Sequence, residues 1–100
     1  MQYKFPKKTI TATGLIHTGP ADFGGFFIGG LNGTNDEVLT IFDGIDGNGS
    51  DYILPPTTIS GATKDVASGS FPFIVLAHTG IYVTITGSGT IKVTLYYKGR

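Results

Sequence analysis

The sequence lacks cysteine and tryptophan and has few charged residues. Without cysteine, this chain of 100 residues can form no disulfide, no zinc–thiolate site and no cysteine nucleophile. Seven basic and seven acidic residues give a formal net charge of +0, which argues against the strong positive field of a nucleic-acid-binding domain. No run reaches the ~18 apolar residues of a membrane-spanning helix. We therefore expect neither nucleic acid nor a membrane as a partner.

Residues that favour helices are also scarce, because glutamate occurs only once, at Glu37. Thr, Ile and Val together fill 30 positions, and 16 glycines and 5 prolines mark turns between them. This composition predicts an all-β fold. We expect a single β-sandwich or jelly-roll-like domain of about seven to eight short antiparallel strands, without substantial helix.

The strand pattern is clearest near the end of the chain. Apolar and polar residues alternate through 81–86 and again through 91–98, on either side of a Gly-Ser-Gly segment. This pattern predicts a β-hairpin, in which Tyr82 and Tyr96 either pair across the strands or meet a partner chain. Pro55 and Pro56 should interrupt ladder pairing, and Gly24 with Gly25 should allow a bulge or a close backbone approach. Residues 8–13 and 15–18 form either two short strands or one strand bent at Gly14. Further strands are expected at 26–28, 37–42, 52–54, 57–60 and 71–77.

Charge is distributed unevenly along the chain. Five of the seven basic residues lie at the two ends, whereas all seven acidic residues lie between Asp22 and Asp65. The two ends therefore form a positively charged patch if they lie together. We expect an N-terminal basic arm at residues 1–8 and a β-sandwich domain at 9–98. The terminal lysines either keep edge strands soluble and unpaired or dock on an acidic neighbouring surface. In the second case the docking side chains are Lys4, Phe5, Lys7 and Lys8.

The sequence shows no catalytic or metal-binding pattern. No Gly-x-Ser-x-Gly motif occurs, and His17 and His78 lie far apart with no cysteine to complete a metal site. The segment at 43–51 does not match the calcium-binding loop of an EF-hand, which needs glycine where Asp51 stands. It is therefore either an Asx-Gly turn or an irregular calcium loop. We expect no enzyme activity, no catalytic residues, no bound metal and no cofactor.

The low charge content points to an assembly component. Only 14% of the residues are charged, compared with about 25% in an ordinary soluble domain. We therefore expect other copies or a partner protein to cover part of the exterior. The Phe-rich runs supply either core residues or contacts between sister copies in a homo-oligomer. The candidate contacts are Phe23, Phe26, Phe27, Ile28, Leu31, Phe71 and Phe73.

Three segments carry a family resemblance: Lys-Thr-Ile-Thr-Ala-Thr-Gly at 8–14, Leu-Thr-Ile-Phe-Asp-Gly at 39–44, and the alternating stretch at 80–97. They resemble small β-sandwich proteins encoded among the virion genes of tailed bacteriophages. The resemblance implies a non-enzymatic capsid decoration, cement, head-fibre or tail accessory subunit, often a trimer, that binds a major capsid or tail protein. Because the first eight residues lack the apolar stretch of a signal peptide, we expect assembly into a virion in the host cytoplasm.

A carbohydrate-binding or adhesin module is the alternative. Such a module would recognise a cell-surface glycan through tyrosine rings and Asp- and Asn-containing loops. The candidate rings are Tyr52, Tyr82 and Tyr96. The absence of tryptophan, which commonly stacks on sugars, counts against this alternative.

Overall fold

β-branched residues alternating with polar ones form eight strands in the computed structural model. The structure describes residues 6–29, 36–59, 67–87 and 91–100, without the side chains of 29 and 67–74. The predicted all-β fold is confirmed, and none of these residues forms a helix that could cross a membrane. The strands are β1 (Lys7–Ile10), β2 (Gly14–Thr18), β3 (Ala21–Gly29), β4 (Glu37–Phe42), β5 (Tyr52–Ile59), β6 (Ala67–Ala77), β7 (Gly80–Gly87) and β8 (Lys92–Gly99).

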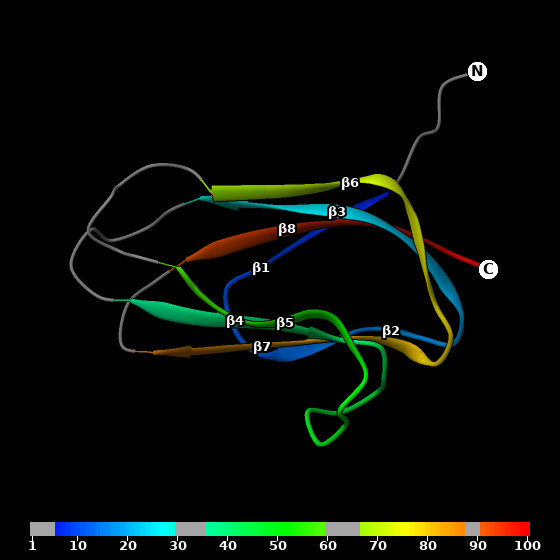
Figure 1. The fold of residues 1–100 in the computed structure, drawn as a ribbon, viewed down its shortest axis with the longest axis horizontal. Coiled ribbons are helices and arrows are strands. Elements are labelled where there is room, and N and C mark those ends of the chain that lie inside the picture. Colours follow the sequence, from blue (N-terminus) through cyan, green and yellow to red (C-terminus); the bar gives the residue numbers. More distant parts are fainter. Residues whose placement is uncertain (1–5, 30–35, 60–66, 88–90) are drawn as a thin grey trace.

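The strands build two antiparallel sheets of four strands each (Figure 1). The upper sheet has the order β1-β8-β3-β6 and the lower sheet the order β2-β7-β4-β5. Thus β1 pairs with β8, β2 with β7, β3 with β6 and β4 with β5. This is the pairing of a jelly roll, in which one long antiparallel ribbon is rolled into two layers. The rolling brings the first and last strands of the chain together.

The predicted C-terminal hairpin is wrong. β7 lies in the lower sheet between β2 and β4, whereas β8 lies in the upper sheet between β1 and β3. Apolar alternation shows which side chains point inward, but it does not identify the partner strand. Tyr82 and Tyr96 therefore lie on different sheets and do not pair across neighbouring strands.

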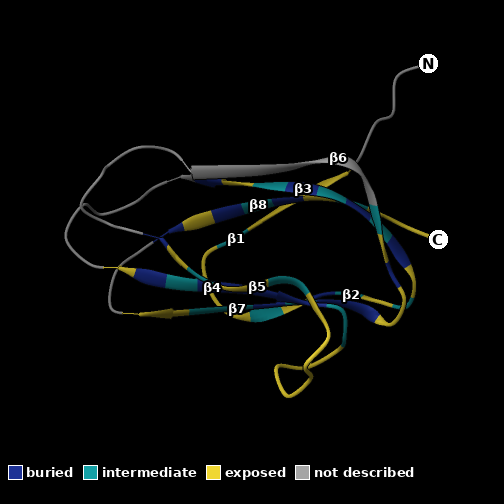
Figure 2. Cartoon of the chain, in the orientation of Figure 1, coloured by how far each residue is buried: buried dark blue, intermediate teal, exposed yellow. Residues whose placement is uncertain are grey.

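The core fills the space between the two sheets (Figure 2). Phe23 and Ile28 are fully buried there, so they expose no surface to a sister copy and are core residues. Glu37 also points inward from β4 and is 2% exposed. The inward row of β8 completes this core with Val93 and Leu95.

Glycine and proline shape the strands in part as predicted. The ladder of β3 shifts register between Phe23 and Gly25, where Gly25 has a φ of 140° that favours glycine, so the predicted bulge is confirmed. The two prolines do not divide the strand around them. β5 continues from Tyr52 to Ile59 as the edge of the lower sheet, with no ladder partner opposite Pro55 and Pro56.

The predicted boundary of the basic arm falls inside the upper sheet. β1 begins at Lys7, so Lys7 and Lys8 are strand residues opposite Tyr96 and Leu95 rather than part of a free arm. Lys8 shares the inward side with Leu95 but is exposed at the sheet edge, a position that discourages further strand pairing. Residues 1–5 of the predicted arm, including Lys4 and Phe5, lie outside the described residues.

Candidate functional site

The outer face of the upper sheet, here called the lysine face, combines basic and aromatic side chains. Alternation along β8 points Lys92, Tyr96 and Lys98 outward, and all three are exposed. The register adds Lys7 beside Tyr96. The acidic side chain on this face, Asp22, accepts a hydrogen bond from Arg100 Nε at 2.9 Å, so its charge is matched. The described part of the lysine face is therefore positively charged.

Two large aromatic side chains interrupt the lysine face. Tyr96 stands opposite Gly25, and Phe27 stands opposite Thr94 in the next outward row. Tyr96 is 36% exposed and Phe27 is 43% exposed. Beside them, Thr9 and Thr94 share a hydrogen bond of 2.9 Å between their Oγ1 atoms. The lysine face therefore presents apolar side chains surrounded by basic ones.

The outer face of the lower sheet carries a second feature, here called the aromatic row. Its members occupy one outward row across all four strands, since β7 places Tyr82 opposite both Leu15 and Phe42, and β4 places Phe42 opposite Tyr52. The Phe42 ring lies 5.3 Å from that of Tyr52 and 6.4 Å from that of Tyr82 between centroids, in tilted contacts. Phe42 is only 7% exposed, whereas Leu15 and Tyr52 are exposed at the two ends of the row.

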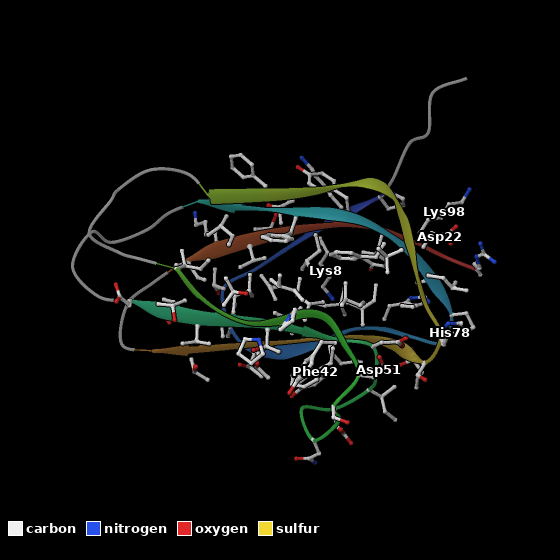
Figure 3. All side chains as sticks on the ribbon, viewed as in Figure 1. Lys8, Asp22, Phe42, Asp51, His78 and Lys98 are labelled. Atoms are coloured by element: carbon white, nitrogen blue, oxygen red, sulfur yellow. The ribbon has the colours of Figure 1, made fainter. Side chains whose placement is uncertain are left out.

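An acidic loop, residues 43–51, lies against the aromatic row and is here called the Asp loop (Figure 3). Asp43 N donates to Asp51 O at 2.9 Å to close the loop, and Asn48 N donates to Asp46 Oδ1 at 3.0 Å in an Asx turn. A Cβ atom added at Gly47 would lie 3.4 Å from Cε1 of Tyr82, so this part of the loop packs on the sheet. The predicted Asx-Gly turn is confirmed.

Asp43 fixes the crossing from the upper to the lower sheet between β6 and β7. Its carboxylate accepts backbone N–H bonds from His78 at 2.9 Å, Thr79 at 2.8 Å and Gly80 at 3.4 Å. Burial acts to raise the pKa of Asp43, but these hydrogen bonds and the charge of His78 outweigh it and leave the pKa below its ordinary value. Sequence reasoning missed this role and placed Asp43 only in a turn.

The fold separates charge of opposite sign onto its two outer faces. No Lys or Arg occurs at residues 9–63 or 65–91, so neither the Asp loop nor any strand of the lower sheet contains one. The basic residues of the chain ends meet because β1 pairs with β8. The aromatic row and Asp loop are thus acidic, and they lie on the opposite side of the sandwich from the lysine face (Figure 1).

The structure groups some of the candidate residues and separates others. Tyr52 and Tyr82 belong to the aromatic row, whereas Tyr96 is on the lysine face. Phe26 is partly buried against the core, and Phe27 is exposed. Leu31 and the side chains of Phe71 and Phe73 lie outside the described part. Among the described residues, no three of His, Asp and Glu are grouped to hold a metal ion.

Comparisons with protein-family models, curated protein sequences and solved structures give no match. The two faces themselves are therefore the evidence for function. Each presents apolar side chains, and the charges around those side chains have opposite signs on the two faces. Such surfaces are suited to binding other molecules.

Proposed function

We propose that this chain is a non-enzymatic structural protein of a bacteriophage virion, a capsid decoration or accessory subunit that binds the particle surface and sister copies. The observation that carries the proposal is the amount of large apolar side chain left outside the core. Among the described residues, the exposed large hydrophobic side chains are Leu15, Phe27, Ile45, Tyr52, Leu76 and Tyr96. Removing such surface from water favours assembly by roughly 25 cal/mol per Å² of apolar area, before the entropy cost of association is subtracted.

The position of the charges supports particle attachment. In this proposal Lys7 and Lys98 on the lysine face dock on an acidic surface of a major capsid or tail protein, in place of the free arm expected from the sequence. Lysine side chains around apolar anchors speed association and select an acidic partner. The chain then acts by adding buried interface to the particle, as a homo-oligomer that we propose to be a trimer.

Antibody labelling tests the proposal and requires no assumption about which virion protein is the partner. An antibody raised against the chain is expected to label virions banded in a density gradient from a lysate of its source. The chain should remain in the virion band through repeated banding, as expected of a bound subunit and not of a loosely adsorbed contaminant. Recovery of the chain only in the particle-free fractions would contradict the proposal.

A neutral cell-surface glycan is a second candidate ligand, favoured by one observation. Tyr52 and Tyr82 flank Phe42 in the aromatic row, beside the exposed carboxylates of Asp46 and Asp51. Aromatic rings stack on the C–H faces of sugars, and carboxylates accept hydrogen bonds from sugar hydroxyls. In this reading the chain is an adhesin module.

A paired substitution tests the glycan candidate. Neutral glycans on an array should bind the unmodified chain, and Tyr52→Ala should reduce binding at least tenfold because it removes an exposed ring of the row. Tyr96→Ala is the matched control, since Tyr96 lies on the opposite sheet with similar exposure. Absence of binding, or equal losses in both variants, would exclude a glycan site at the aromatic row.

A further inference from the structure

We infer that sister copies of this chain associate head to tail, with the lysine face of one copy on the aromatic row and Asp loop of the next. The inference rests on the proposed function, because it names the two surfaces through which sister copies bind. It commits the aromatic row to a second copy of the chain, and the lysine face of the copy at the end of a stack remains available to dock on the particle. A glycan on that row is therefore a competing outcome.

Charge complementarity is the first argument. The lysine face offers Lys7, Lys92 and Lys98, all exposed, while its Asp22 is already paired with Arg100. The opposite face offers the exposed Asp46 and Asp51, and its strands contain no Lys or Arg. Pairing either face with its own copy would place like charges opposite each other, which is unfavourable. Pairing the two different faces places lysines opposite aspartates.

The apolar side chains give the second argument. Tyr96 and Phe27 stand out from the lysine face, and Leu15 and Tyr52 stand out at the two ends of the aromatic row. Both faces thus provide aromatic or aliphatic anchors surrounded by charge, the usual layout of a specific interface. Only the head-to-tail arrangement buries both sets of anchors and also matches the charges.

The size of the faces is sufficient. Four strands at ~4.8 Å spacing and eight residues at ~3.3 Å each outline a face of roughly 500 Å². With side-chain relief and the Asp loop added, such a face can supply the ~800 Å² per partner of a specific interface. Because the two faces lie back to back, contacts made flat on both faces propagate as an open stack, and a ring such as a trimer closes only if each contact tilts one copy against the next.

Charge reversal tests the inference by sedimentation velocity at matched concentrations. One variant carries Lys7→Glu, Lys92→Glu and Lys98→Glu, and the other carries Asp46→Lys and Asp51→Lys. All five side chains are exposed, so both variants should fold, which thermal unfolding checks. We expect each variant alone to associate at least tenfold more weakly than the unmodified chain, and an equimolar mixture of the two to regain its mass.

A third chain with all five substitutions controls for attraction between proteins of opposite net charge. Its two faces exchange sign within one molecule, so it should associate with itself again. Association of the unmodified chain should also weaken several-fold between 50 and 500 mM salt, because salt screens the facing charges.

The outcomes separate this inference from the proposed function. If the unmodified chain forms oligomers that neither variant disturbs, or if the mixture and the fivefold variant stay monomeric, the head-to-tail contact is overturned and the proposed function stands. If the unmodified chain is a monomer but the antibody still labels virions, the proposed docking on the particle stands. The proposed homo-oligomer and the head-to-tail contact are then both overturned. A chain absent from virions contradicts the proposed function, whether or not its copies associate head to tail.

Discussion

Gly80→Ala is expected to lower the free energy of unfolding by about 3 kcal/mol, through forced overpacking at a fixed backbone contact. Gly80 is buried at the start of β7, where the chain enters the lower sheet. A Cβ atom there would lie 2.6 Å from His17 O and 2.8 Å from Gly44 O. Both neighbours are backbone atoms in hydrogen-bonded segments, so neither can move aside cheaply.

Thermal unfolding measures this effect. For a domain of this length, a loss of about 3 kcal/mol lowers Tm by roughly 10–20 °C. Gly14→Ala is the matched control, because Gly14 is also a strand residue but has no atom within 4 Å of an added Cβ. Equal melting temperatures for the two variants would contradict the described packing at the crossing.

Asp43→Ala is expected to cost about 2 kcal/mol at neutral pH. The substitution removes the acceptor of three backbone N–H groups, those of His78, Thr79 and Gly80, and leaves a turn between two sheets without its anchor. Hydrogen bonds to a charged acceptor contribute more than neutral ones, and partial exposure of the site lets water replace part of the loss.

The pH dependence gives the Asp43 prediction its signature. Since the folded pKa of Asp43 lies below its ordinary value of 3.8, the carboxylate contributes stability above that pH. The contribution is lost as the pH falls through the folded pKa. Asp43→Asn should therefore show a smaller loss of stability than the unmodified chain as the pH falls below 3.8.

Asp51→Ala is the control for the Asp43 variants. Asp51 belongs to the same loop but is exposed, so its removal should change the free energy of unfolding by no more than about 0.5 kcal/mol. Urea unfolding at several pH values measures all of these variants. Identical pH profiles for Asp43→Asn and the unmodified chain would show that the carboxylate does not hold the crossing.

Much of the fold follows from local sequence signals. The bounds of β4 match the predicted strand because its apolar residues lie between strong turn residues, and the bulge in β3 follows from Gly24 and Gly25. The pairing of the strands did not follow from these signals. The alternation of β7 and β8 is the same whether they form a hairpin or face each other across a core, because period two encodes a side and not a partner.

The candidate faces were predictable only in part. Lysines at both chain ends predicted a basic patch on condition that the ends meet, and the pairing of β1 with β8 supplies that condition. The aromatic row needs the register of four strands at once, which no single segment encodes. Asp43 anchors the crossing by accepting hydrogen bonds from residues at least 35 positions later in the sequence. The residues next to Asp43 in the sequence do not indicate these contacts.

The solution mass of the unmodified chain tests the central claim most directly, namely that its two outer faces need another protein surface. Light scattering at low salt and high concentration should give a mass of at least three copies, falling toward one copy as salt is raised. A strict monomer of 10.5 kDa under all of these conditions would contradict the account of how sister copies associate.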